Sequence, residues 1–95
     1  MQLILTEKVI SWFKEEWGFV EDDFIKIFVR YGGSSTIHSS FSLGISKEEP
    51  NEVGISTTEQ GITFYIEQDD MWYIDGKNLK VDFMEDTEEV LFSVE

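Results

Sequence analysis

The chain contains no cysteine, one histidine and one proline. Without thiols it can form neither disulfides nor thiolate metal sites, and cysteine nucleophiles and cysteine-based redox chemistry are excluded. It also lacks any apolar run approaching the ~18 residues of a membrane helix, and its N-terminus lacks the basic and apolar regions of a secretion signal. The sequence therefore predicts a cytoplasmic protein with no membrane partner.

Positive charge is scarce as well. Seven Lys and Arg residues stand against twenty Asp and Glu, giving a net charge of −13. Residues 48–95 hold fourteen of the acids and two of the bases, whereas residues 1–47 hold six and five. Because such a field repels nucleic acid and anionic membranes, we expect no nucleic-acid partner. The excess charge serves either solubility or the attraction of a basic protein partner.

Apolar side chains are abundant. Hydrophobic residues make up 41% of the chain and aromatic residues 15%, including eight Phe, three Tyr and three Trp. This content is sufficient for a core that needs neither disulfides nor metal, and 95 residues suit one domain. The sequence therefore predicts a single domain spanning residues 1–95.

The N-terminal part has helical periodicity. Thr6 is typical of a helix N-cap, and Gly18 of a C-terminal stop. The apolar residues expected on one helical face are Val9, Ile10, Phe13 and Trp17. Trp12 and Trp17 are five positions apart, about 140° around an α-helix, so we expect at most one of them in the middle of that face.

The rest of the chain has the composition of β-strands. The predicted strands are residues 2–5, 24–30, 41–45, 61–67, 72–74, 79–83 and 90–94. Asp75-Gly76 indicates a turn whose glycine adopts positive φ, and residues 31–40 and 47–60 read as irregular connections. The expected fold is α+β: a mostly antiparallel sheet, curled or sandwich-like, with one N-terminal amphipathic helix.

Several local words resemble the HesB/IscA-like iron–sulfur cluster biosynthesis family. A Leu-Thr pair leads into the helix, and a strand ends in Arg30 before the Gly/Ser stretch of residues 32–36. Residues 73–83 then read Tyr-Ile-Asp-Gly-Lys-Asn-Leu-Lys-Val-Asp-Phe, which is similar to the family's strand, Asp-Gly turn and Leu-x-x-Asp-Phe pattern. The chain looks like a cysteine-free branch of that family.

The resemblance implies the HesB-like fold, a cytoplasmic setting and the capacity to form a homodimer. Family members act through three cysteines, and here the loop position is Ser34, whose hydroxyl is a poor ligand for iron–sulfur centres. The predicted function is accordingly an A-type-carrier-like accessory or interaction module, without enzymatic activity, cofactor or cluster. The alternative is an acidic module that recognises a basic protein through residues 48–95.

No catalytic, cofactor-binding or metal-binding residue is predicted. The residues predicted for partner contact, or for the family's loop positions, are Arg30, Gly32, Gly33, Ser34, Trp72 and Tyr73. Because neighbours on a strand face opposite ways, we expect one of Trp72 and Tyr73 in the core and the other in contact with a partner. His38 is predicted to be a loop histidine, because transition-metal sites need several nitrogen or sulfur ligands. The acids of residues 67–70 are predicted to lie in a solvated turn.

Overall fold

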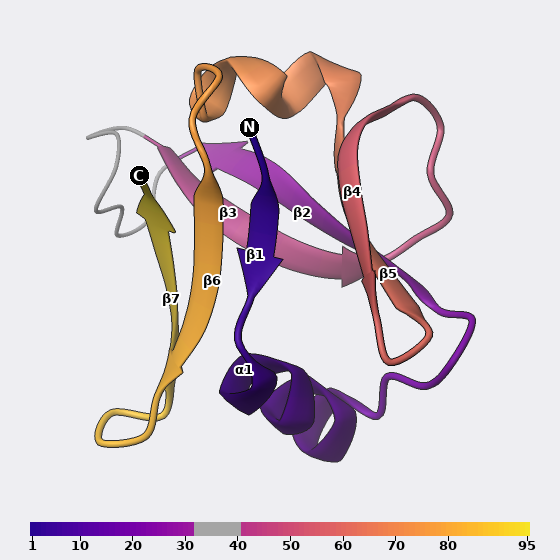
Figure 1. Ribbon diagram of the computed structural model, residues 1–95, viewed down its shortest axis with the longest axis vertical. Coiled ribbons are helices and arrows are strands. Elements are labelled where there is room, and N and C mark those ends of the chain that lie inside the picture. The colour runs from indigo at the N-terminus through magenta and orange to yellow at the C-terminus, as the bar shows by residue number, and fades with distance from the viewer. Residues whose placement is uncertain (32–40) are drawn as a thin grey trace.

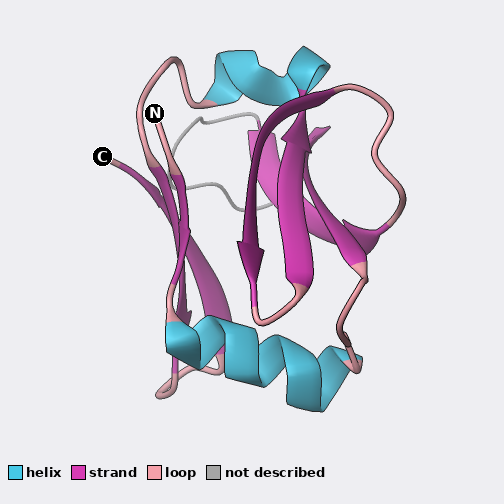
Figure 2. Cartoon of the chain, turned by 45° about the vertical axis from the view of Figure 1, so that its right-hand side comes forward, coloured by secondary structure: helices cyan, strands magenta, loops and turns pink. Residues whose placement is uncertain are grey.

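The computed structural model describes residues 1–31 and 41–95, which form two β-sheets with helical segments at both ends (Figures 1 and 2). The elements in chain order are β1 (Leu3–Leu5), α1 (Glu7–Trp12), the π-helix η1 (Phe13–Trp17), β2 (Phe24–Tyr31), β3 (Phe41–Lys47), β4 (Val53–Glu59), β5 (Ile62–Glu67), the 3₁₀-helix η2 (Gln68–Tyr73), β6 (Leu79–Met84) and β7 (Glu89–Val94). One sheet has the order β1-β6-β7 and the other β3-β2-β5-β4.

Each sheet is mixed. In the smaller sheet β1 runs parallel to β6, with Leu3 opposite Leu79, while β6 and β7 are antiparallel. In the larger sheet β2 runs parallel to β5, with Phe24 opposite Thr63, and the other pairs are antiparallel. The predicted α+β class is confirmed. Three of the five described strand pairs are antiparallel, in keeping with the predicted mostly antiparallel arrangement, but each sheet also holds one parallel pair that joins segments far apart in the sequence.

The N-terminal helix begins and ends where the sequence predicts. The Thr6 hydroxyl accepts a hydrogen bond from Val9 N at 3.3 Å, and Gly18 ends the helix with a φ of 71°. The last turns differ from expectation, because the α-helix passes into a π-helix from Phe13 onward. This change of hydrogen bonding alters which side chains share a face.

Two other segments differ from the sequence predictions. Residues 72–74 are not a strand, since η2 continues to Tyr73. Within the connection predicted for residues 47–60 lies β4, which pairs with β5 through a tight turn whose residues Gln60 and Gly61 have φ values of 53° and 81°. That turn provides the left-handed backbone that suits the twist of a hairpin.

The core fills the space between the two sheets and under the helix. Phe13, Ile25, Phe64 and Val81 are fully buried and come from the helix, both sheets and both ends of the chain. Burying such a side chain contributes roughly 1.5–3 kcal/mol. Figure 2 shows α1 and η1 covering one end of the sheets and η2 covering the other. None of the described helices is long and apolar enough to cross a membrane.

Candidate interaction face

The structure scatters the residues that the sequence singled out. Arg30 is exposed near the end of β2, on the larger sheet. Gly32, Gly33 and Ser34 lie outside the described residues, as does His38. Within the described ranges, no group of three or more His, Asp or Glu side chains is arranged to hold a metal ion.

Trp72 and Tyr73 lie on η2, at the upper end of Figure 1. Tyr73 is 3% exposed and belongs to the core, whereas Trp72 is 52% exposed. Their ring centroids are 5.8 Å apart in an edge-to-face arrangement. Helical rotation therefore separates the two side chains, in place of the strand alternation that the sequence suggested.

The carboxylates around η2 bind backbone amides. Glu67 accepts hydrogen bonds from Asn51 N at 2.8 Å and Glu52 N at 2.7 Å, and these bonds hold the pKa of Glu67 below its usual value. Asp70 accepts one from Val29 N at 3.2 Å. A hollow of about 420 Å³ beside them is lined by Lys26, Glu48, Glu49, Asn51, Glu67, Asp69 and Asp70. These acids fix the start of β4 and the edge of η2, a structural role.

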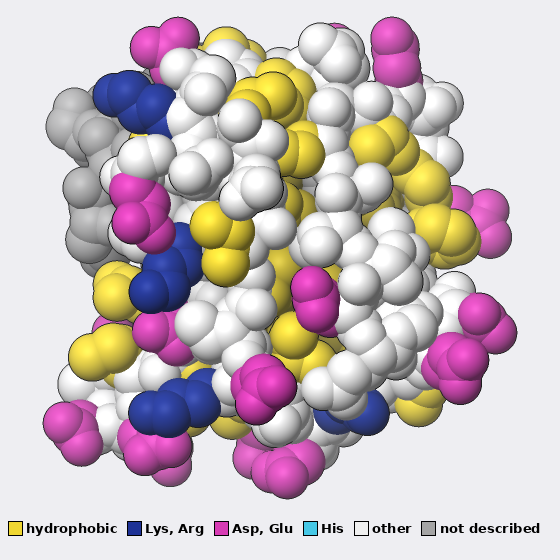
Figure 3. Space-filling view, viewed as in Figure 1, with side chains coloured by type: hydrophobic (Ala, Val, Ile, Leu, Met, Phe, Trp, Pro, Cys, Tyr) yellow, Lys and Arg dark blue, Asp and Glu magenta, His cyan; other side chains and the backbone are white. Residues whose placement is uncertain are grey.

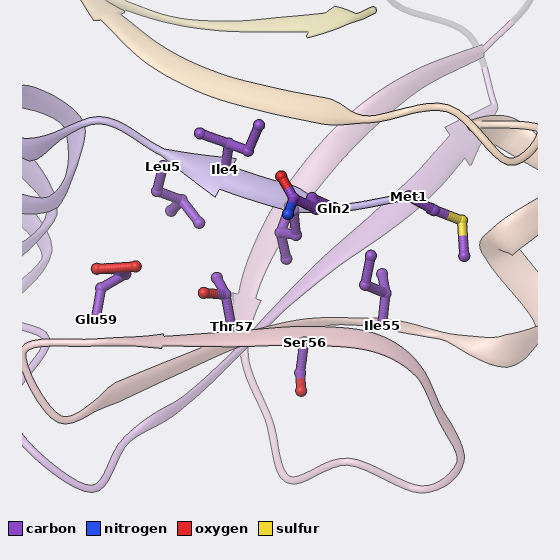
Figure 4. Close-up of a pocket in the computed structure, with 9 residues that line it drawn as sticks. Met1, Gln2, Ile4, Leu5, Ile55, Ser56, Thr57 and Glu59 are labelled. Carbon is purple, nitrogen blue, oxygen red and sulfur yellow. The ribbon is translucent and has the colours of Figure 1, made fainter.

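A second hollow, of about 400 Å³, lies between β1 and β4, the facing edges of the two sheets (Figure 4). The side chains of Ile55 and Thr57 point toward β1, while Ser56 points away. Among the described residues that line it, Glu59 carries the one ionisable side chain. Apart from Glu59, the side chains of this groove present apolar, amide and hydroxyl groups.

The opposite end carries a row of aromatic rings. The Trp12 and Phe83 rings stack with centroids 5.0 Å apart and planes 23° apart, which joins the helix to β6. Trp17 lies 6.1 Å from Trp12 and meets Phe19 edge-on at 5.5 Å. Phe19 is buried, Trp12 and Phe83 are half-buried, and Trp17 is 45% exposed. The row is thus anchored in the core and open to solvent at Trp17.

A hollow of about 410 Å³ lies beside this row, between the helix and the β6–β7 turn. Its lining consists of Glu7, Lys8, Ser11, Trp12, Glu15, Phe83 and Glu85. Trp12 and Phe83 supply its apolar wall, and the acids form its rim. The Lys8 ammonium and the Glu85 carboxylate bridge helix and turn at 3.8 Å, and both side chains are more than 60% exposed. Figure 3 shows acidic side chains crowding this lower edge of the molecule, with basic groups between them.

The helix is held in place by a chain of hydrogen bonds. The Thr6 hydroxyl donates to Asp82 Oδ1 at 2.8 Å, and the same carboxylate oxygen accepts from Phe83 N at 2.8 Å. The Thr6 hydroxyl and then the Phe83 amide lower the pKa of Asp82. This carboxylate therefore connects the helix N-cap to β6 one residue from the stacked Phe83 ring. It fixes the two walls of the hollow relative to each other.

Sequence reasoning missed this face. In an α-helix Trp12 and Trp17 point about 140° apart. In η1 the wider i→i+5 bonding brings both rings onto one side. Two tryptophans at i and i+5 on an amphipathic helix were the available signal, and they did not reveal the change of helix type.

Comparison with known proteins shows a relationship along the whole chain. No model of a known protein family matches. The chain is 41% identical over 92 residues to a pyruvate dehydrogenase inhibitor of Bacillus subtilis, and the match covers 97% of both chains. It is 32% identical over 96 residues to an uncharacterised protein of Staphylococcus saprophyticus, covering 98% of both, and 27% identical over 95 residues to one of Staphylococcus epidermidis, covering 97% of both.

These comparisons overturn the predicted family. The predicted membership of the HesB/IscA-like iron–sulfur family is wrong. No family model supports it, and the Bacillus relative, which matches along nearly the full length, is named a pyruvate dehydrogenase inhibitor. The predicted accessory role in iron–sulfur assembly is wrong with it. The alternative prediction, a generic acidic module that recognises a basic protein through residues 48–95, is overturned by the same relationship. The chain belongs to the family of small proteins that includes the Bacillus subtilis pyruvate dehydrogenase inhibitor and the uncharacterised staphylococcal proteins.

Proposed function

We propose that this protein is a regulator that inhibits pyruvate dehydrogenase by binding to it. The observation that carries the proposal is the 41% identity, over 97% of both chains, with a protein named for that inhibition. At this level of identity along the full length the fold is shared, and a common target is the simplest account of the relationship. A target of this kind implies a cytoplasmic protein.

The described surface suits a binding protein better than a catalyst. Trp17, Trp72 and Leu91 are all at least 40% exposed, and tryptophan is enriched at the centres of protein interfaces. The three described carboxylates with lowered pKa values, Asp23, Glu67 and Asp82, all accept hydrogen bonds from backbone amides. We infer that inhibition by this protein acts through occupation of the enzyme's surface, without covalent chemistry.

The charge of the chain indicates the character of its target surface. A protein with a net charge of −13 associates fastest with a surface rich in lysine and arginine. We infer that the enzyme surface contacted by this protein is basic.

Titration of the purified protein into Bacillus subtilis pyruvate dehydrogenase tests the function. We expect a saturable loss of enzyme activity and co-elution of the two proteins in gel filtration. Two controls are needed. An unrelated small protein of similar negative charge should not inhibit pyruvate dehydrogenase, and this protein should not inhibit an unrelated dehydrogenase. Full activity in a large molar excess of this protein, with no co-elution, would contradict the proposal.

A further inference from the structure

We propose that the enzyme docks on the α1 end of the molecule, where Trp12 and Phe83 receive an apolar side chain of the partner, and where Trp17 and the acidic rim bind a lysine or arginine that flanks it. This inference rests on the proposed function and names the surface that performs it. The face that it uses is the aromatic row and its acidic rim, here called the tryptophan face, comprising Glu7, Trp12, Glu15, Trp17, Phe83 and Glu85.

The helix type is the first argument for this face. π-helical turns are rare, and they occur frequently at functional sites. Here η1 has the specific effect of moving Trp17 beside Trp12, at 6.1 Å, instead of far around the helix. Trp17 stays 45% exposed even though its ring also contacts Phe13 and Phe19 edge-on. A ring held by buried neighbours and open on one side needs little ordering when a partner binds.

The hollow beside the row supplies the second argument. Its wall is the stacked pair of Trp12 and Phe83, and its volume is about 410 Å³. Anchor side chains in protein interfaces fill pockets of this kind near the centre of the contact. The side chain that fits this wall is apolar or aromatic, because the half-buried rings of Trp12 and Phe83 present apolar surface to the hollow.

The charge of the rim determines which partner residues can flank the anchoring side chain. Glu7, Glu15 and Glu85 surround the hollow, and Lys8 is the base that lines it with them. The ion pair between Lys8 and Glu85 is exposed, and such pairs contribute little to stability. A cation of the partner can therefore replace Lys8 at small cost. The exposed ring of Trp17 also binds a lysine or arginine by cation–π attraction.

The opposite end offers a matched alternative. Trp72 on η2 is 52% exposed, close to the 45% of Trp17. However, two of the carboxylates near it, Glu67 and Asp70, already accept bonds from backbone amides. Those acids are thus less available to a cationic partner than the rim of the tryptophan face. The two tryptophans form a controlled pair, since they share residue type and similar exposure at opposite ends of the fold.

The decisive experiment measures binding of Bacillus subtilis pyruvate dehydrogenase to immobilised protein carrying Trp17→Ala or Trp72→Ala. We expect Trp17→Ala to raise Kd at least about 30-fold, the range of interface hot spots, and Trp72→Ala to change it by less than about 3-fold. Circular dichroism and thermal melting establish that both variants are folded. Trp17→Phe keeps a ring at this position and should restore most of the affinity.

A second pair of variants tests the rim without touching the aromatic core. Glu7→Gln, Glu15→Gln and Glu85→Gln together remove three negative charges from the tryptophan face. The matched control, Glu52→Gln, Asp69→Asn and Asp75→Asn, removes three from exposed positions at the η2 end. We expect the first set to slow association about 10-fold and to flatten its dependence on salt, and the control to have a much smaller effect.

The outcomes separate this inference from the function beneath it. If the unchanged protein binds the enzyme but Trp72→Ala or the η2-end charge set causes the larger loss, the tryptophan face is not the docking site and the proposed function stands. Equal effects of the charge variants at the tryptophan face and at the η2 end would also contradict the assignment of the tryptophan face as the docking site. If the unchanged protein neither binds nor inhibits the enzyme, the proposed function itself fails.

Discussion

The two ends of this small fold are held together by different forces. At the α1 end, aromatic rings pack in a continuous row from Phe83 to Phe19, and Phe13 beneath them is fully buried. At the η2 end, carboxylates accept hydrogen bonds from backbone amides, as Glu67 does from those of Asn51 and Glu52. The first end depends mainly on apolar contact, supplemented by the Asp82 carboxylate that joins the helix cap to β6, whereas the second depends mainly on ionised acids. Substitutions at each end should therefore respond differently to conditions.

The largest effect is expected from Phe13→Ala. The ring is 0% exposed and contacts Trp12, Trp17, Phe19 and Phe64. Removing it leaves a cavity under the aromatic row and costs about 3–5 kcal/mol in the free energy of unfolding, measured in urea at neutral pH. Phe24→Ala, at a site 38% exposed, is the matched control and should cost less than half as much. A loss of less than about 1.5 kcal/mol in the free energy of unfolding for Phe13→Ala would show that packing against Phe13 does not stabilise the aromatic row.

An intermediate effect is expected from Thr6→Ala. This change removes the helix cap to Val9 N and the hydroxyl that donates to Asp82, and losing such a cap costs about 0.5–2 kcal/mol. The pKa of Asp82 should rise toward its ordinary value, because the Thr6 hydroxyl is the first cause of its lowering. Urea unfolding measures the first effect and an NMR pH titration the second. Thr6→Ser keeps the hydroxyl and should leave both quantities nearly unchanged.

The smallest effect is expected from Glu67→Gln, and it should depend on pH. The amides of Asn51 and Glu52 lower the pKa of Glu67 in the folded protein below 4.5, so its ionised form stabilises the fold. The advantage of the unchanged protein over the variant is therefore full above about pH 4.5. It should shrink as the pH falls through the lowered pKa of the folded state. Urea unfolding of both proteins at several pH values measures this difference.

Glu49→Gln is the control for that experiment, since it removes the same charge from an exposed acid that lines the same hollow. We expect it to lack the loss of stability seen at Glu67. A difference between Glu67→Gln and the unchanged protein that stays constant down to pH 3 would contradict the role of the carboxylate at the η2 end.

The local features of the fold were predictable from the sequence. The Thr6 cap, the Gly18 stop and the positive φ of Gly76 each depend on a residue and its immediate backbone neighbours, and the structure shows all three. The strict alternation of residues 79–83 likewise gave β6 nearly at its observed bounds. Such signals require no knowledge of distant partners.

The long-range features were not predictable for the same reason. The parallel pairing of Leu3 with Leu79 joins opposite ends of the chain, and no local pattern encodes it. Residues 72–73 have strong β propensity, yet they end a 3₁₀-helix whose Met71 side chain packs on β4 where Gly54 has no Cβ. The family prediction was wrong because it also depended on local patterns. Asp-Gly turns and an Arg-ended strand reflect local turn chemistry that unrelated proteins share.

The tryptophan face was half visible in the sequence. Trp17 could be assigned to the apolar side of the helix, and its proximity to Trp12 could not, because that depends on the transition to η1. The contribution of Phe83 depends on β6 lying under the helix, which the tertiary structure alone determines. The predicted contact at Trp72 remains the competing hypothesis, and the paired tryptophan variants decide between them.

The parallel pairing of β1 with β6 also has a consequence for biosynthesis. During translation, residues 3–5 leave the ribosome long before residues 79–94, on which the smaller sheet depends. Until then the nascent polypeptide holds its N-terminal strand without a neighbour and its amphipathic helix without the Phe83 ring. The smaller sheet can therefore form only after residues 79–94 have emerged, and ribosome-stalled chains ending before residue 79 should be sensitive to protease.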